Sequence, residues 1–256
     1  MGMANNRKKI YTRAEFEALR RRFARKMDRD QGLKAKALAL KIQAGHKYYW
    51  VHQFNWMGEP FLQLTTDLMA FQEIIYRHRP EYVVEIGVAW GGSLLMYATL
   101  APLVGIKKVV GVDVFIPADL RQRLASKTHL ARYLHLVEGS SVDENTVRRV
   151  KKLLGRSRRI LVILDSNHTE AHVLQELQLY TPLIGKGGYL VVGDTVIERQ
   201  PPAHLRPRAW GQGNNPATAL RKFRRSCARF VPDRDLEAKL LFTNMPGGYW
   251  LCRKDP

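Results

Sequence analysis

From residue 82 onward, hydrophobic residues gather into short continuous runs that are separated by stretches with helical periodicity. The runs predict buried strands at residues 82–87, 108–113, 134–138, 160–165 and 188–193. The periodic stretches predict helices at residues 92–103, 117–131, 142–154 and 169–184. Continuous apolar strands that alternate with helices are typical of a parallel sheet covered on both faces. We therefore expect an α/β fold with a mostly parallel sheet.

The N-terminal part follows a different pattern. Residues 13–44 are dominated by good helix formers, with apolar residues at helical spacing among charges, and they predict a helix. Residues 46–60 are dense in aromatics without a clean period, which predicts a packed loop that either covers a site or docks the helix on the core. A further amphipathic helix is predicted at residues 64–78. We expect residues 1–60 to form a helical arm with an aromatic cap, and residues 61–256 to form the α/β domain.

The C-terminal pattern changes from alternating strands and helices to two neighbouring strands. Residues 239–243 and 249–253 are apolar and enclose a turn formed by Pro246, Gly247 and Gly248, which predicts an antiparallel hairpin. The expected sheet therefore has seven strands, of which the last two form this C-terminal hairpin.

The charge of the chain is strongly positive, and the surplus is concentrated near the N-terminus. The net charge is +19 over 256 residues, and residues 1–50 hold 14 lysines and arginines against 4 aspartates and glutamates. This balance fits either a solvated helical arm or attraction to an anionic partner, such as a nucleic acid, a membrane surface, an acidic glycan or a nucleotide-sugar. No apolar run reaches ~18 residues, so we expect no transmembrane segment. The two widely separated cysteines suit a cytoplasmic protein.

The first predicted strand ends in a glycine-rich turn, VVEIGVAWGGS at residues 83–93. In an open parallel sheet, ligands bind beyond the C-terminal ends of the strands. Gly87 and Gly91 are four residues apart, which differs from the dinucleotide fingerprint but still lets a backbone approach a ligand closely. A carboxylate from Glu85 suits the amino group and sulfonium of S-adenosylmethionine. The alternative is an ordinary tight turn between a strand and a helix.

The next two strands also end in polar residues. Asp113 closes the second strand, where a carboxylate can accept hydrogen bonds from ribose hydroxyls, although it could equally cap a helix. Ser140 and Ser141 follow the third strand and could contact the edge of an adenine. Alternatively, Ser141 caps the helix at 142–154, with Glu144 completing a capping box.

Two acids and a histidine follow the fourth and fifth strands. Asp165 and Asp194 end neighbouring strands, which lie ~4.8 Å apart, so their carboxylates should converge. A divalent ion such as Mg²⁺ would relieve their repulsion and lower the pKa of a bound hydroxyl. His168 is then placed to act as the general base. The alternatives are that Asp165 caps the following helix and that His168 is a turn residue bonded to the backbone.

A long polar stretch at residues 198–216 lacks regular periodicity and contains four prolines. Long irregular segments in compact domains are often lids. Within it, Trp210, Asn214 and Asn215 are suited to stack on a sugar-like ring and to form hydrogen bonds with it. The alternative is a loop without a role in substrate binding.

Taken together, these motifs resemble one known family. In order and spacing, six segments are similar to the cephalosporin hydroxylase/rhamnosyl O-methyltransferase family over about Tyr48 to Trp250: VEIGVAWGGSLLMYATLA, GVDV, VEGSS, VILDSNHT, VVGDT and WGQGNNP. The resemblance implies a Rossmann-like class I methyltransferase that binds S-adenosylmethionine and uses Mg²⁺ to methylate a hydroxyl of a sugar or secondary metabolite. It also implies a homo-oligomer.

The resemblance assigns roles to individual residues. It makes Asp165 and Asp194 the metal ligands and His168 the base, and it lines the cofactor pocket with Glu85, Gly87, Ser93, Asp113 and Ser141. One position departs from the pattern, because some relatives carry a second acid where this chain has Gly193. Fewer carboxylates would then hold the metal. The family name does not imply an iron oxygenase, since no facial triad of two histidines and a carboxylate is evident.

The leading expectation is therefore a metal-assisted O-methyltransferase that acts on a small-molecule or glycan acceptor. The basic arm would also suit an RNA ribose methyltransferase, but we find no recognised RNA-binding module, so nucleic acid is not the favoured partner. A non-catalytic partner subunit that only binds the cofactor is a third reading, against which the retained acids and histidine argue. Contact with a membrane surface stays open.

Overall fold

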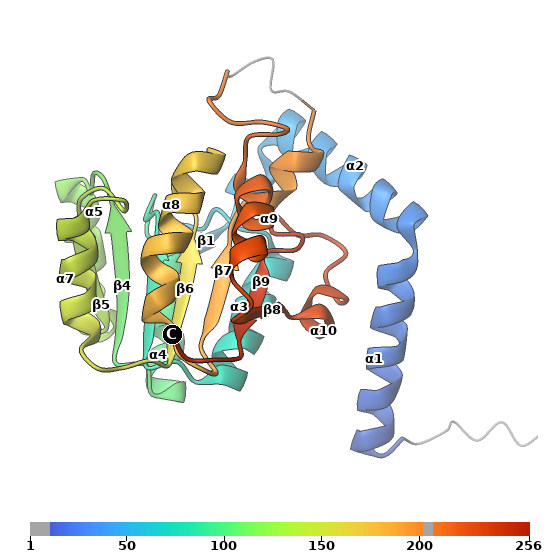
Figure 1. The fold of residues 1–256 in the computed structure, drawn as a ribbon, viewed down its shortest axis with the longest axis horizontal. Helices are drawn as coiled ribbons and strands as arrows, with labels where there is room; N and C mark the ends of the chain where they lie inside the picture. Colours follow the sequence, from blue (N-terminus) through green and yellow to red (C-terminus); the bar gives the residue numbers. More distant parts are fainter. Residues whose placement is uncertain (1–10, 202–206) are drawn as a thin grey trace, which may run out of the picture.

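A seven-stranded sheet forms the centre of the molecule, for which the computed structural model describes residues 11–201 and 207–256. The strand order is β5-β4-β3-β6-β7-β9-β8, with β3 to β7 parallel and β9 antiparallel to both of its neighbours (Figure 1). The strands are β3 (Tyr82–Ile86), β4 (Lys108–Asp113), β5 (Leu134–Glu138), β6 (Ile160–Leu164), β7 (Tyr189–Val192), β8 (Phe230–Pro232) and β9 (Tyr249–Cys252). The predicted Rossmann-like α/β fold with a mostly parallel sheet is confirmed.

Helices cover both faces of this sheet. They are α3 (Thr65–His78), α4 (Gly92–Val104), α5 (Ala118–Ser126), α6 (Thr128–Ala131), α7 (Glu144–Leu154), α8 (Glu170–Tyr180), α9 (Pro216–Ser226) and α10 (Arg234–Glu237), with short 3₁₀ turns η2 (Thr181–Leu183) and η3 (Thr195–Arg199). The predicted helix at 117–131 is divided into α5 and α6 at Lys127.

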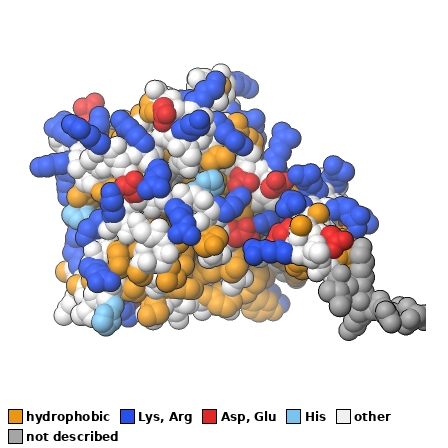
Figure 2. All heavy atoms as spheres, turned by 90° about the horizontal axis from the view of Figure 1, so that it is seen from below, with side chains coloured by type: hydrophobic (Ala, Val, Ile, Leu, Met, Phe, Trp, Pro, Cys, Tyr) orange, Lys and Arg blue, Asp and Glu red, His pale blue; other side chains and the backbone are white. Residues whose placement is uncertain are grey.

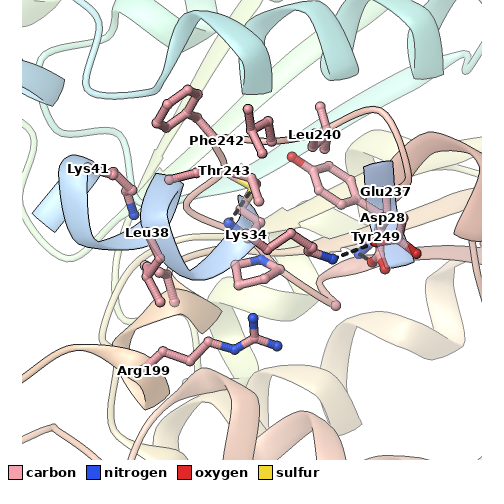
Figure 3. Close-up of a pocket in the computed structure, with 16 residues that line it drawn as sticks. Asp28, Lys34, Leu38, Lys41, Arg199, Glu237, Leu240, Phe242, Thr243 and Tyr249 are labelled. Carbon is pink, nitrogen blue, oxygen red and sulfur yellow. Dashed lines mark hydrogen bonds and ion pairs between the residues drawn. The ribbon is translucent and has the colours of Figure 1, made fainter. Parts of the chain in front are cut away.

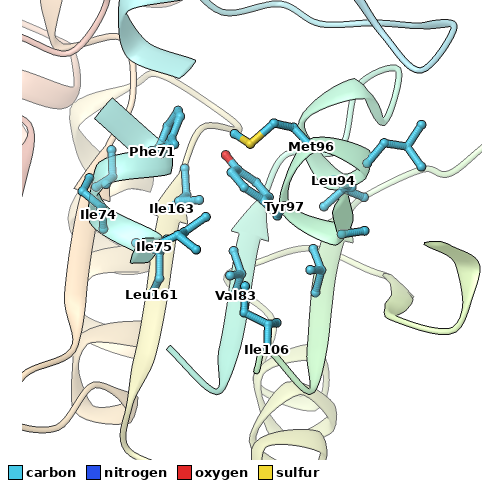
Figure 4. Packing of buried hydrophobic residues seen from close by; sticks show 14 of the residues in the cluster. Phe71, Ile74, Ile75, Val83, Leu94, Met96, Tyr97, Ile106, Leu161 and Ile163 are labelled. Carbon is cyan, nitrogen blue, oxygen red and sulfur yellow. The ribbon is translucent and has the colours of Figure 1, made fainter. Parts of the chain in front are cut away.

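Neighbouring residues of a strand point to opposite faces of the sheet, where they belong to two separate hydrophobic clusters. Val83 points into the cluster with α3 and α4, where the Phe71 and Tyr97 rings meet edge to face at 5.6 Å between centroids (Figure 4). Val84 points into the opposite cluster, which packs against α7, α8 and α9. All five residues of β6 are buried, which is why continuous apolar runs predicted these strands. Each fully buried aliphatic side chain contributes roughly 1.5–3 kcal/mol to folding.

The N-terminal arm consists of two helices, α1 (Arg13–Arg29) and α2 (Gln31–Tyr48), where one helix was predicted. Asp30 divides them, because its side chain accepts a hydrogen bond from the Leu33 N–H and starts a new helix. In Figure 1, α1 stands beside the core, and its described contacts include an ion pair of 3.0 Å between Arg25 and Asp235 of α10.

The aromatic segment at 46–60 is more regular than the predicted loop. The helix α2 continues to Tyr48, and a 3₁₀ turn η1 (Trp50–His52) and a small hairpin of β1 (Asn55–Trp56) and β2 (Glu59–Pro60) follow. Trp50 packs edge to face on Phe242 with ring centroids 6.4 Å apart, which ties this segment to the C-terminal part of the domain.

The predicted C-terminal hairpin is wrong in one of its strands. The partner of β9 is β8 at Phe230–Pro232, whereas residues 239–243 form turns. These turns are fixed by α3, since Thr66 donates a hydrogen bond of 2.5 Å to the Phe242 carbonyl. Leu240 is buried in the cluster on that side of the sheet. The apolar pattern of 239–243 therefore reflects packing under α3 and not strand pairing.

The surface carries the positive charge expected from the composition. Lys and Arg side chains are spread over the face in Figure 2, with few acids among them. Among the helices of the described residues, none has the length and apolar character needed to cross a bilayer.

Candidate active site

A cavity of about 750 Å³ opens at the C-terminal ends of β3, β6 and β7. Its floor is made by residues that follow these strands, among them Gly87, Asp165 and Asp194. Its walls come from α2, η1 and the segment after η3. The cavity therefore lies where ligands bind in open parallel sheets.

Two carboxylates and an imidazole converge on the floor of this cavity. One ligand atom each from Asp165, His168 and Asp194 lies within 4.8 Å of the others, and His168 Nε2 is 3.3 Å from Asp194 Oδ2. The convergence follows from the pairing of β6 with β7, because the two acids follow adjacent parallel strands. Asp194 adopts a left-handed backbone conformation with φ 46°, which is a strained state typical of functional sites. The donor set of carboxylate oxygens and imidazole suits a divalent cation.

The surroundings of Asp165 favour a bound cation. Burial, with a smaller contribution from the neighbouring Asp194 carboxylate, raises the pKa of Asp165 well above its ordinary value. Gln63 from the segment before α3 donates a hydrogen bond of 2.7 Å to Asp165 Oδ2. Its own Oε1 is buried without a hydrogen-bond partner among the described residues, so a donor group of a ligand is the partner that it lacks.

Gly193 is required for the position of Asp165. A Cβ at this glycine would lie 2.4 Å from Asp165 Oδ1 and 2.9 Å from the Leu164 carbonyl oxygen. The chain therefore has no room for a side chain at this position unless Asp165 moves. Gly87 packs equally tightly, because its Cβ would lie 2.2 Å from the Asp165 carbonyl oxygen and its φ is +99°.

We expect Gly193→Ala to weaken divalent-cation binding and to slow the reaction about a hundredfold, because Asp165 must shift by roughly 1 Å. Calorimetric titration with Mg²⁺ and a methyl-transfer assay measure these effects, and thermal unfolding reports on the fold. Gly211→Ala is the matched control, since its Cβ meets nothing within 4 Å. Unchanged Mg²⁺ affinity in a folded Gly193→Ala variant would contradict this account.

Glu85 lies at the other end of the cavity floor, on β3. Its carboxylate accepts hydrogen bonds from Ser93 Oγ at 2.6 Å and from the Tyr97 hydroxyl at 3.1 Å. Burial is the main cause that raises the pKa of Glu85 to about 8. Gly91 adopts φ 79° and starts α4, so that the N-terminus of this helix faces the cavity beside Ser93. The structure thus brings the predicted Glu85, Gly87, Gly91 and Ser93 together.

Asp113, Ser140 and Ser141 lie outside the described lining of the cavity. Asp113 accepts a hydrogen bond of 2.8 Å from the Val88 N–H and so holds the glycine-rich turn in place. Ser141 donates a hydrogen bond to Glu176 and does not cap α7, whose cap is Asp143. The predicted capping box of Ser141 and Glu144 is therefore wrong.

The predicted lid residues fall into two groups, and residues 202–206 of the predicted segment lie outside the described residues. Trp210 lines the cavity and meets the His168 ring edge to face at 5.0 Å between centroids. Asn215 is fully buried and caps α9 by accepting hydrogen bonds from the Ala217 and Thr218 N–H groups. Asn214 accepts a hydrogen bond of 2.9 Å from the Glu170 N–H. These two asparagines hold the segment together and do not face the cavity.

Several lining residues were not predicted from the sequence. They come from α2, η1 and the segment before α3: Lys41, His46, His52 and Gln63. The aromatic density of residues 46–60 was the only signal that this region covers a site. Which residues line the cavity depends on how α2 packs across the sheet edge. No local sequence pattern predicts this packing.

Comparisons with known proteins agree with this geometry. The family model for rhamnosyl O-methyltransferase/CmcI matches residues 47–254. The chain is 30% identical over 216 residues to the rhamnosyl O-methyltransferase of Mycobacterium leprae, covering 82% of this chain and 89% of that protein. The enzyme of the same name from Mycobacterium tuberculosis is 29% identical over 211 residues, covering 80% of this chain and 82% of the relative.

A solved structure of CmcI, described as holding Mg and SAM, has the same fold. It superimposes with a TM-score of 0.54 at 20% sequence identity, covering 78% of this chain and 77% of that one. The cofactors predicted from the sequence are those named for that protein. Because the family model spans most of the chain, the chain belongs to the rhamnosyl O-methyltransferase/CmcI family of O-methyltransferases.

Proposed function

We propose that this protein transfers the methyl group of S-adenosylmethionine to a hydroxyl of a sugar or glycosylated metabolite, with the assistance of a divalent cation such as Mg²⁺. One observation carries the proposal: the Asp165, His168 and Asp194 cluster shares a single cavity with Glu85 and the glycine-rich turn. Such a cavity can hold a cationic methyl donor and a metal-bound hydroxyl next to each other. The names of the relatives support a sugar acceptor.

The donor half of the cavity suits a cationic amino acid group. Glu85 would accept hydrogen bonds from the amino group, and Ser93 keeps its carboxylate oriented through the 2.6 Å hydrogen bond. Gly87 lines the cavity, and its lack of a side chain lets the backbone of the turn pack against the Asp165 backbone. Asp113 would then act on the nucleoside indirectly, by fixing the turn through the Val88 N–H. Ser140 and Ser141 stay predicted contacts of the adenine.

The acceptor half suits deprotonation of a hydroxyl. Asp165 and Asp194 would hold the divalent cation, which when bound lowers the pKa of an acceptor hydroxyl. His168 Nε2 would take the hydroxyl proton as the oxygen attacks the methyl carbon and the bond from that carbon to sulfur breaks. The products are a methyl ether and S-adenosylhomocysteine. Trp210 limits the rotation of the His168 ring by packing against it.

The other sequence predictions fit this assignment and stay predictions. They are the division into an arm at residues 1–60 and a methyltransferase domain at 61–256, a homo-oligomer, and a cytoplasmic location. Helix α2 would then form part of the active site, because several residues of α2 line the cavity.

The proposal is tested with the purified chain and a labelled methyl donor. Two classes of acceptor are compared, rhamnosides and other sugars on the one hand and RNA on the other, and a reaction without acceptor is the control. We expect calorimetric binding of S-adenosylmethionine, label transfer to a sugar, and loss of transfer when a chelator is added. Label transfer to RNA alone would identify a ribose methyltransferase. Binding of the methyl donor without transfer to any acceptor would favour a non-catalytic subunit.

We also expect the affinity for S-adenosylmethionine to rise with pH, by about tenfold from about pH 6 to 7. The reason is that Glu85, whose pKa is raised to about 8 in the ligand-free protein, must lose its proton before it can bind a cationic group. Calorimetry across this range measures the slope, and Glu85→Gln should flatten it. The same slope in Glu85→Gln would show that another group carries the proton.

A further inference from the structure

Lys41 is a buried lysine whose charge the protein leaves unpaired. It lies on the inner side of α2 with 4% of its surface exposed. Its Nζ has no hydrogen-bond partner among the described residues. Burial lowers the pKa of Lys41, although the carboxylates of Asp194 and Asp67 partly oppose this effect. A buried ammonium without a partner is costly, so its presence calls for a group that the structure does not supply.

Neither nearby acid is a dedicated partner for Lys41. Within the described part of the chain, no ion pair of Lys41 with a carboxylate occurs within 4.0 Å. Asp67 already accepts hydrogen bonds from the Tyr249 hydroxyl at 2.9 Å and from the Asn244 N–H at 2.8 Å. Asp194 faces His168 and the metal-ligand cluster. A third group must therefore approach Nζ if the charge is to be neutralised.

Lys41 is placed to meet a ligand. It borders the active-site cavity and also a second cavity of about 220 Å³. Figure 3 shows its side chain extending from α2 among the residues that line this second cavity, which Arg199 also borders. Lys41 is thus a lining residue that the two cavities share.

The charged side chains that line the active-site cavity differ between its floor and its walls. Its acids are Glu85, Asp165 and Asp194, all on the strand ends that would hold the donor and the metal. The walls from α2, η1 and the segment before Trp210 contribute Lys41, His46, His52 and Arg208, and none of the lining acids. Arg208 stacks on the Trp210 ring at 5.0 Å from its centroid. The walls above the metal-ligand cluster therefore carry two cationic side chains, Lys41 and Arg208, and no lining acid.

We propose that Lys41 binds an anionic group of the acceptor, a carboxylate or a phosphate, and so makes the enzyme selective for acidic sugars. The inference rests on the proposed function, because it requires the acceptor to enter this cavity. The anionic group would approach Nζ while the neighbouring hydroxyl faces His168. Lys41 is thus a specificity-determining residue, and it takes no part in the proton transfer.

The test compares acidic and neutral sugars as ligands of the full-length chain saturated with S-adenosylhomocysteine and Mg²⁺. The probes are methyl glucuronide for the carboxylate, glucose 1-phosphate for the phosphate, and methyl glucoside as the neutral counterpart. We expect calorimetry to show that at least one acidic probe binds about ten to a hundred times more tightly than the neutral one. The probe with the larger ratio identifies the source of the charge.

Variants assign this preference to Lys41. Lys41→Met should remove it, Lys41→Arg should retain most of it, and Lys36→Met, at an exposed position of the same helix, should leave it unchanged. Because Lys41→Met removes a buried unpaired charge, the unfolding temperature of the ligand-free protein should rise. A purely structural lysine would give the opposite shift.

Two outcomes overturn the proposal. One is that neither acidic probe binds the wild-type chain more tightly than methyl glucoside. The other is that Lys41→Met keeps the preference. Failure of the proposed function has a separate signature, since the wild-type chain would then transfer no label to any sugar acceptor, whatever the relative affinities of the three probes.

Discussion

Asp165→Ala should abolish methyl transfer, with a loss of about a thousandfold or more in kcat. The carboxylate lies at the centre of the site, within 4.8 Å of ligand atoms of both His168 and Asp194. Its removal would take away one of the two acids that would hold the cation. A thousandfold loss in kcat corresponds to several kcal/mol of metal-assisted stabilisation of the transition state. Mg²⁺ affinity should fall with activity. The rate with the best sugar acceptor and a calorimetric Mg²⁺ titration measure the two effects.

The fold should survive this substitution. Burial raises the pKa of Asp165, which means that the ionised carboxylate is held at a cost in the metal-free protein. Its removal should therefore leave the unfolding temperature of the metal-free chain unchanged or raised. Asp119→Ala on α5 is the control, because this acid is exposed and is not among the residues that line the cavity. Full activity of Asp165→Ala would refute the metal site.

The strand-end part of this site was predictable because local sequence patterns mark where each strand ends. Continuous apolar runs are buried on both faces of a parallel sheet, so the strand ends could be read from the sequence. Once the order of the strands in the sheet is known, acids at the ends of adjacent parallel strands are expected to converge, as Asp165 and Asp194 do. The glycine-rich turn is marked locally in the sequence, since Gly87 and Gly91 adopt the positive φ angles that favour glycine.

Long-range packing decided the features that were mispredicted or missed. Residues 239–243 have a strand-like apolar pattern, but α3 buries them as turns, and the short edge strand β8 takes their place. Asn215 has a side chain suited to a sugar, yet its Oδ1 caps the start of α9 and its Nδ2 donates hydrogen bonds to Glu198 and to the Gly211 carbonyl. In the sequence, Lys41 is one of many charged residues in a basic helix. Only the structure shows that α2 borders the cavity. None of these three features can be predicted from the amino-acid composition.

His168→Ala should lower kcat by about a hundredfold to ten-thousandfold, the range typical for loss of a positioned general base. The ring packs edge to face on Trp210, and its Nε2 lies 3.3 Å from Asp194 Oδ2. This arrangement keeps Nε2 beside the atoms that would bind the acceptor hydroxyl. The affinities for S-adenosylmethionine and Mg²⁺ should change little, and added imidazole should restore part of the rate.

The same cluster allows a different role for His168, and the experiment separates the two. If His168 is a third metal ligand and not the base, His168→Ala should lose Mg²⁺ affinity in step with activity, and raising the Mg²⁺ concentration should restore the rate. A base leaves Mg²⁺ affinity intact and responds to imidazole instead. His129→Ala, at an exposed position on α6, controls for loss of a histidine as such. The result decides whether an imidazole supplies the third protein ligand beside Asp165 and Asp194.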